Sequence, residues 1–328
     1  MNTPSATWQQ ALADAFDSVA DLCAYLQLSP ADLNLPEQAS AFPLRVPRDF
    51  AARMQAGNPD DPLLRQVLPD LAELTDYRGY TDDPVGDLKA VAETGVIHKY
   101  RGRVLFIMTG ACAVHCRYCF RRNFPYGELQ LSGRQFESAL TYVERHPEIS
   151  EVILSGGDPL LLSDAKLEQL MFRFAEIGHI KRIRIHTRTP VVLPERVTKA
   201  LLRTFAALPK PVVMVLHVNH AQELSNSVNQ ICTELKLSGV TLLNQSVLLK
   251  GINDDGEQLR ELSEKLFSFN ILPYYLHLLD RARGVGHFEV SEAEAKILHQ
   301  HLQRHLPGYL VPRLVKEQAG AAFKIPIC

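Results

Sequence analysis

Long apolar runs are missing from this 328-residue sequence. No run reaches the roughly 18 apolar residues that cross a bilayer, and the N-terminus lacks the basic stretch and apolar core of a secretion signal. A surplus of one charge is missing too, because 35 Lys and Arg face 37 Asp and Glu, for a formal net charge of −2. That balance argues against nucleic-acid and membrane partners. We expect a cytoplasmic protein.

A disulfide framework is also missing. Of six cysteines, Cys112, Cys116 and Cys119 lie within eight positions, and the others are scattered at positions 23, 232 and 328. This distribution predicts a reducing compartment and a metal site. Hydrophobic residues make up 46% and charged residues 22%, which is typical of a globular protein and excludes disorder.

Six short apolar runs predict parallel strands that are buried on both faces. They cover residues 104–108, 151–155, 182–186, 212–218, 240–249 and 272–279. Helical patterns separate them at 134–144, 164–177, 194–205, 222–237 and 256–267. The spacing of about 30 residues is that of β-α-β units. We therefore predict an α/β protein with an incomplete parallel (β/α)6 barrel. An open doubly wound sheet is the alternative, but its glycine-rich dinucleotide turn is missing.

Three regions are expected along the chain. Residues 1–95 are predicted to be mostly helical, beginning with an amphipathic helix from Trp8 to Leu26. Residues 96–285 form the predicted barrel, and residues 286–328 a helix and a short closing segment. The first region contains no recognisable functional motif, and we expect it to contribute to packing or oligomerisation.

Polar residues follow the predicted strands where each strand ends. They include Ser155 to Asp158, His186 to Arg188, His217, Asn219, His220, Lys250, Asn253, Asp254 and Asp280. Because the carboxyl ends of parallel strands meet at one rim of a barrel, and active sites are built there, this pattern predicts an enzyme.

The cysteine cluster has three interpretations. A structural zinc site needs four ligands, and His115 could be the fourth. Three unliganded buried thiols are the simplest alternative. An iron–sulfur cluster held by three cysteines would leave one iron open for a substrate or cofactor.

The spacing CxxxCxxC, with Tyr118 before the last cysteine, resembles the radical S-adenosylmethionine superfamily. The resemblance implies a 4Fe–4S cluster on Cys112, Cys116 and Cys119 that binds S-adenosylmethionine. Gly156-Gly157-Asp158 is similar to the superfamily's glycine-rich motif, which contacts the methionyl amine. Without this resemblance, these glycines would indicate only a tight turn after a strand.

Further motifs resemble the lysine 2,3-aminomutases, in particular the bacterial branch that supplies β-lysine for modification of elongation factor P. They are HKYRGRVLFIMTGACAVHCRYCFRR, ILSGGDPL, TRTPVVLPERV, LLNQSVLLKGIND, PYYLHLLD and the terminal FKIP, within residues 95–328. The resemblance implies an isomerase that converts L-α-lysine to β-lysine with pyridoxal phosphate as an additional cofactor. It also implies an electron donor such as flavodoxin or ferredoxin, and a downstream elongation factor P ligase.

Site residues follow from the same resemblance. Lys324 lies where the aminomutases hold pyridoxal phosphate as a Schiff base. The phosphate is expected on Lys99 and Arg103, and Arg188 is a further expected cofactor-binding residue. Arg121 matches the arginine that binds the substrate carboxylate, since a guanidinium fork suits a carboxylate. Asp280 and Glu317 match two carboxylates for the distal ammonium, although an aspartate is expected where Glu317 stands.

Other functions stay open at this point. Another cationic amino acid such as arginine could be the substrate. A non-catalytic zinc or iron–sulfur module would have the cysteines without the converging Arg, Lys and Asp residues. A DNA-repair lyase should carry a basic face, which the net charge does not favour.

Overall fold

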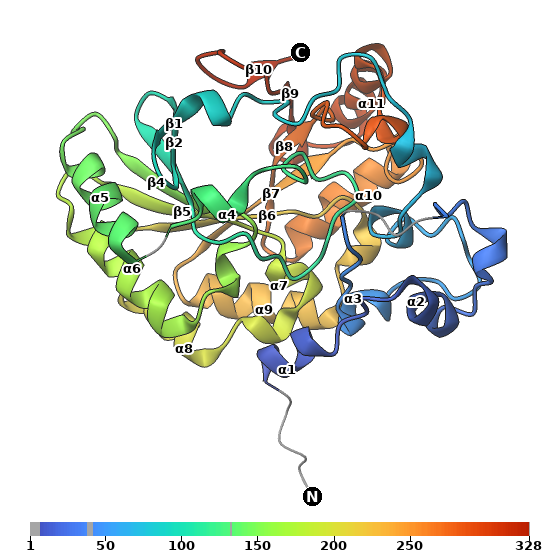
Figure 1. Ribbon diagram of the computed structural model, residues 1–328, viewed down its shortest axis with the longest axis horizontal. Coiled ribbons are helices and arrows are strands. Elements are labelled where there is room, and N and C mark those ends of the chain that lie inside the picture. Colours follow the sequence, from blue (N-terminus) through green and yellow to red (C-terminus); the bar gives the residue numbers. More distant parts are fainter. Residues whose placement is uncertain (1–6, 38–41, 132, 328) are drawn as a thin grey trace, which may run out of the picture.

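The computed structural model of the protein describes residues 7–37, 42–131 and 133–327, so that Cys328 lies outside the described residues. Within this part, ten strands form one sheet whose neighbours follow the order of the chain (Figure 1). The strands are β1 (Val91–Glu93), β2 (Val96–Tyr100), β3 (Arg103–Ile107), β4 (Glu151–Ser155), β5 (Arg182–Thr187), β6 (Val212–Leu216), β7 (Thr241–Val247), β8 (Leu272–His277), β9 (Arg313–Lys316) and β10 (Ile325–Pro326).

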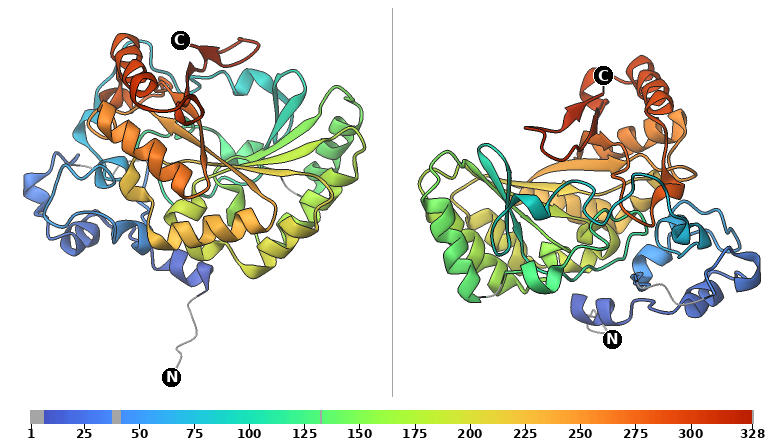
Figure 2. Two further views of the ribbon diagram at one scale, coloured as in Figure 1. Left: turned by 180° about the vertical axis from the view of Figure 1, so that it is seen from behind. Right: turned by 45° about the horizontal axis from the view of Figure 1, so that its top comes forward.

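Strands β3 to β9 are parallel to their neighbours, and β1, β2 and β10 extend the two edges with antiparallel pairs. The sheet curls, with helices on its convex side, and its ends β1 and β10 are not joined (Figures 1 and 2). The prediction of an incomplete parallel barrel is therefore confirmed, and all six predicted strands are present. The seventh parallel strand, β9, was not predicted, because four residues give too short an apolar signal.

Helices precede the sheet in the N-terminal region and lie between the parallel strands in the rest of the chain. They are α1 (Trp8–Ala13), α2 (Val19–Tyr25), α3 (Arg48–Ala51), α4 (Tyr126–Leu129), α5 (Gly133–Glu144), α6 (Asp164–Glu176), α7 (Thr189–Val192), α8 (Lys199–Ala207), α9 (Asn226–Leu237), α10 (Gly256–Ser268) and α11 (Glu292–His305). Short 3-10 helices cover Pro30–Asp32, Leu64–Gln66, Leu71–Leu74, Leu88–Ala90, Pro159–Leu161, Pro194–Arg196, Ala221–Glu223, Gly286–Phe288 and Gly308–Leu310. Among the described residues, no helix is both long enough and apolar enough to span a bilayer.

Local signals explain where these helices begin. The side chains of Ser163, Thr198, Ser225, Asp255 and Ser291 each accept a hydrogen bond from the first turn of the helix that follows. Such N-caps satisfy backbone donors that have no partner inside the helix. The apolar faces of α5, α6, α8 and α9 then pack on the sheet in one large buried cluster.

The prediction of one helix from Trp8 to Leu26 is wrong. Helix α1 ends at Ala13, and the backbone of Phe16 pairs with Val46 through bonds of 2.8 and 2.9 Å. Ser18 then caps α2. A contact with a distant segment thus interrupts a pattern whose apolar spacing is helical throughout. The predicted helix at 194–205 also begins late, because Thr198 caps α8.

The N-terminal region packs against residues 109–123, which we call the cysteine loop. Ala113 and Val114 share a buried cluster with the N-terminal region. The buried carboxylate of Glu73 forms ion pairs with Arg117 and Arg122, the latter at 2.7 Å. One carboxylate of the N-terminal region therefore pairs with two arginines of the loop.

Replacement of Glu73 by Gln should destabilise the protein strongly. It removes the carboxylate that pairs with the wholly buried guanidinium of Arg117, and breaking a buried ion pair costs about 3–5 kcal/mol. The free energy of unfolding, measured by denaturant titration, reports the loss. Glu137→Gln is the control, because the Glu137–Arg173 pair lies on the surface and should contribute nothing measurable. Equal effects of the two substitutions would contradict this account.

Candidate active site

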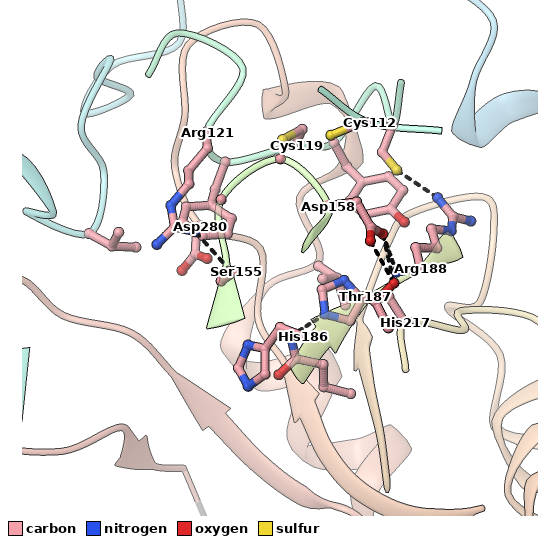
Figure 3. A pocket seen from close by; sticks show the side chains of 18 of the residues that line it. Cys112, Cys119, Arg121, Ser155, Asp158, His186, Thr187, Arg188, His217 and Asp280 are labelled. Atoms are coloured by element: carbon pink, nitrogen blue, oxygen red, sulfur yellow. Dashed lines mark hydrogen bonds between the residues drawn. The ribbon is translucent and has the colours of Figure 1, made fainter. Parts of the chain in front are cut away.

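A cavity of about 550 Å³ opens at the carboxyl ends of the parallel strands (Figure 3). Every site residue predicted from the sequence lines it: Lys99, Arg103, Cys112, Cys116, Cys119, Arg121, Gly156, Gly157, Asp158, Arg188, Asp280, Glu317 and Lys324. Elements from β2 to the segment before β10 thus contribute to one site. The N-terminal region contributes as well, because Phe42, Pro43, Val85 and Asp87 line the same cavity.

The three cysteines follow β3 on the cysteine loop. All three thiols are free and partly exposed. Burial raises the pKa of the Cys119 thiol to about 11, and the neighbouring Cys116 adds to the rise. No three His, Cys, Asp or Glu side chains of the described residues are grouped as ligands of a single metal ion. The thiols instead lie along one wall of the cavity.

Arg188, at the end of β5, lies beside the cysteines. Its guanidinium donates to Cys116 Sγ at 2.7 Å, to Gln66 Oε1 at 2.6 Å and to Glu223 Oε2 at 2.9 Å. Glu223 is wholly buried and also accepts from the backbone of Asn219 at 2.8 Å. Sequence reasoning missed Gln66 and Glu223, which lie on short 3-10 helices without a motif.

The glycine motif follows β4 and lies against the cysteine loop. Gly156 has a φ of +116°, which favours glycine. A Cβ atom on Gly157 would lie 2.3 Å from the carbonyl oxygen of Ala111. The Asp158 carboxylate accepts from Thr187 Oγ1 at 2.7 Å and from the backbone of Arg188 at 2.8 Å (Figure 3). The Asp158 carboxylate therefore already accepts hydrogen bonds from the protein. The glycines allow the backbone after β4 to approach the backbone of the cysteine loop closely.

Five alternating charges form a buried chain across the cavity. Arg121 Nη2 lies 2.7 Å from Asp87 Oδ2, and Asp87 Oδ1 lies 3.0 Å from Lys99 Nζ. Lys99 Nζ also lies 3.2 Å from Glu317 Oε1, and Glu317 Oε2 pairs with Lys324 Nζ. We call this Arg121–Asp87–Lys99–Glu317–Lys324 arrangement the charge chain. It joins the N-terminal region, β2, the cysteine loop and the C-terminal segment.

Neighbouring cations decide the ionisation of both carboxylates in the charge chain. Burial raises the pKa of Asp87, but Arg121 and Lys99 outweigh it and the net shift is downward. Burial also raises the pKa of Glu317, and Lys324 and Lys99 again reverse the direction. Both side chains are therefore anions at neutral pH.

Asp280 follows β8 and behaves differently. Burial raises the pKa of its carboxylate to about 7, and the nearby charge of Lys324 opposes the rise only in part. No hydrogen bond or ion pair to this carboxylate occurs within the described residues. An unpaired carboxylate in a buried position is costly when ionised, so a cation that reaches Asp280 would be bound strongly.

Three histidines complete the wall: His186 and His217, which were predicted at the ends of their strands, and His277, which lies in the motif PYYLHLLD. His186 lies near the end of β5, His217 follows β6, and His277 is the last residue of β8. All three line the cavity. Burial lowers their pKa, that of His217 to about 3. The Nε2 atoms of His186 and His277 are buried without a hydrogen-bond partner among the described residues. The cavity therefore offers neutral imidazoles to a polar ligand.

The sequence model of the Radical SAM superfamily matches residues 106–262. The L-lysine 2,3-aminomutase of Escherichia coli is 44% identical over the whole of this chain and 96% of its own length. That of Haemophilus influenzae is 46% identical over 88% of each chain, and that of Clostridium subterminale 31% identical over 98% of this chain and 77% of its own. The chain belongs to the L-lysine 2,3-aminomutase family.

This aminomutase is thus an isomerase with a radical SAM domain. Among solved structures, a radical SAM methyltransferase from Sphaerobacter thermophilus matches with a TM-score of 0.48 and 16% identity, over 67% of this chain and 68% of its own. The family implies a 4Fe–4S cluster and S-adenosylmethionine. The residues present fit both groups, because three free thiols share a wall of the cavity with the closely packed glycine motif.

The raised pKa of Asp280 predicts a stability effect with a definite sign. Between about pH 4 and 7 the folded protein keeps a proton on Asp280 that the unfolded chain has released, so stability falls as pH rises. In the cofactor-free protein, Asp280→Asn removes this loss. The free energy of unfolding of the variant minus that of the parent should therefore increase by about 2 kcal/mol from pH 5.5 to pH 8, because one pKa unit corresponds to 1.36 kcal/mol.

Denaturant titrations of both proteins at the two pH values measure this difference. Asp60→Asn, at a side chain that is 82% exposed, serves as the control and should show no such trend. A difference that shrinks with rising pH would mean that Asp280 is stabilised as an anion.

Proposed function

We propose that this aminomutase converts L-α-lysine to β-lysine by moving the amino group from C2 to C3. The observation that carries the proposal is the convergence of Lys324, Arg121, Asp280 and the three cysteines on one cavity. When bound, a 4Fe–4S cluster, S-adenosylmethionine and pyridoxal phosphate supply the radical and the electron-delocalising chemistry of such a reaction. The protein's own residues bind and orient the reactants.

Two groups of residues are proposed to hold the cofactors. Cys112, Cys116 and Cys119 would bind the cluster, while Gly156, Gly157, Asp158 and Arg188 would form the S-adenosylmethionine site. Lys324 would hold pyridoxal phosphate covalently, with Lys99 and Arg103 on its phosphate. The cationic Lys99 and Lys324 and the unpartnered Nε2 atoms of His186 and His277 suit a polar anionic ligand. Lys324 Nζ lies 5.8 Å from the centre of the Tyr275 ring, which can flank a planar ligand.

The substrate is proposed to extend between Arg121 and Asp280. Arg121 would bind the carboxylate through its guanidinium fork. Asp280 would accept the distal ammonium, because this carboxylate has no hydrogen-bond or ion-pair partner among the residues that the structure describes. Glu317 is the second proposed acid for that ammonium, although Lys324, Lys99 and Tyr100 occupy it in this structure.

The surroundings of the reaction are proposed from the same family likeness. The N-terminal region, residues 1–95, would cover the barrel of residues 96–285, and residues 286–328 would deliver Lys324. A flavodoxin or ferredoxin would donate the electron, and an elongation factor P ligase would consume the β-lysine. We propose the cytoplasm as the location, since a reduced cluster and free thiols require a reducing compartment.

The cluster and the reaction can be tested together under anaerobic conditions. Reconstituted protein should bind about four irons per chain and form β-lysine from L-lysine. Cys112→Ala, Cys116→Ala and Cys119→Ala should each remove the cluster absorbance and all turnover. Cys232→Ala, at a buried cysteine that does not line the cavity, is the matched control and should keep both. Zinc in place of iron, or turnover of arginine but not lysine, would contradict the proposal.

The covalent cofactor site has its own test. Borohydride reduction of protein loaded with pyridoxal phosphate should fix the label on Lys324, as read by peptide mass mapping. Lys324→Ala should lose the label and the cofactor absorbance while keeping its iron. Lys250→Ala is the control, because Lys250 lies outside the cavity. A label found on Lys99 or Lys250 would disprove the assignment.

A further inference from the structure

Asp87 is an acidic residue of the N-terminal region that lines the cavity, although its sequence context gave no functional signal. Only 2% of the residue is exposed. Its Oδ1 atom lies 3.0 Å from Lys99 Nζ, and its Oδ2 atom accepts from Arg121 Nε at 2.8 Å and lies 2.7 Å from Arg121 Nη2. One carboxylate therefore bridges a proposed phosphate-binding lysine and the proposed substrate-binding arginine.

The backbone of Asp87 is held in place by its own segment. The amide of Asp87 donates to Asp83 Oδ1 at 2.8 Å, and that of Leu88 donates to Asp83 Oδ2 at 3.1 Å. Gly86, with a φ of +70°, packs so closely on Ala319 that a Cβ atom would lie 2.9 Å from the Ala319 Cβ. Asp87 is thus fixed both by a local turn and by the C-terminal segment.

The contacts leave one edge of Arg121 available. Asp87 binds the edge formed by Nε and Nη2, while Nη1 has only a 3.3 Å bond to Ser155 Oγ. A guanidinium can bind one carboxylate on each of two edges. Asp87 therefore orients the guanidinium without filling the edge that a substrate carboxylate would need.

The same carboxylate offsets the repulsion between two buried cations. Lys99 and Arg121 both lie within 3.0 Å of Asp87 oxygen atoms, and charges this close interact strongly away from bulk water. Without Asp87, each cation would move toward another partner, such as Glu317 for Lys99. Both anion-binding positions would then be lost together.

We propose that Asp87 is a positioning residue that fixes the phosphate-binding lysine and the substrate-binding arginine of this aminomutase relative to each other. The inference rests on the proposed function, because it takes pyridoxal phosphate and an amino acid as the two ligands. Asp87 touches neither ligand in this account and acts through Lys99 and Arg121. A positioning residue differs from a purely structural one because its replacement should lower the affinity for both ligands, pyridoxal phosphate and lysine, at the same time.

The test measures two constants on the anaerobically reconstituted full chain. The dissociation constant of pyridoxal phosphate is obtained from its absorbance change, and KM and kcat for lysine from β-lysine formation. Asp87→Asn should raise the dissociation constant and the KM at least about 10-fold each, since every 10-fold loss corresponds to 1.4 kcal/mol. Iron content should be unchanged, and kcat at saturating lysine should change less than KM.

Two substitutions provide matched controls. Asp82→Asn changes a neighbouring aspartate that pairs with Arg283 on the surface, and should leave both constants at the parent values. Asp280→Asn should raise the KM for lysine without changing the affinity for pyridoxal phosphate. Of the three substitutions to asparagine, only that of Asp87 should raise both the dissociation constant of pyridoxal phosphate and the KM for lysine.

Asp87→Glu covers the case in which Asp87→Asn does not fold. It keeps the buried negative charge, but the extra methylene prevents the carboxylate from holding both cations, so both constants should rise at least 3-fold. Constants within 2-fold of the parent for either folded variant would overturn the proposal. A lower KM would overturn it as well, because Asp87 would then compete with the substrate. Failure of the parent protein to bind pyridoxal phosphate would refute the proposed function instead.

Discussion

The charge chain Arg121–Asp87–Lys99–Glu317–Lys324 is the constraint on which the site depends. Its three cations come from the cysteine loop, β2 and the C-terminal segment, which are far apart in sequence. Without the two carboxylates, three positive charges would repel one another in a cavity shielded from water. The alternation of sign therefore lets one small volume hold the three cations, two of which are proposed to bind a phosphate and a carboxylate.

The cysteine loop is fixed by similar means on its other side. Glu73 pairs with Arg117 and Arg122, and Arg188 connects Cys116 with Gln66 and Glu223. The loop is thus held between the N-terminal region and the end of β5. These contacts give the loop a defined geometry, which the proposed iron–sulfur cluster with one open position requires. The N-terminal region consequently does more than pack against the barrel.

Much of this arrangement could be predicted from the sequence. Near-continuous apolar runs such as Glu151–Ser155 identified the strands, and the cysteine spacing identified the radical SAM superfamily. The missed parts depend on contacts between distant segments. Phe16 pairs with Val46 and interrupts a helical pattern, and Asp87 reaches Arg121 only after the chain has folded. Periodicity is a local signal, whereas a buried ion pair between residues 34 positions apart has no local signature. Glu317 was predicted as a substrate contact, and the hydrogen bonds that it accepts from Lys324 and Tyr100 became visible only in the structure.

In the proposed reaction, residues of this cavity hold lysine while its amino group moves between adjacent carbons. Isotope labelling tests this transfer. Lysine that carries ¹⁵N at the α-amino group is incubated anaerobically with the reconstituted enzyme, S-adenosylmethionine, pyridoxal phosphate and a reductant. NMR of the product then shows which carbon carries the labelled nitrogen. We expect β-lysine with the label on the nitrogen at C3, formed only when all components are present. Label that remains at C2, or that is released as ammonium, would contradict it.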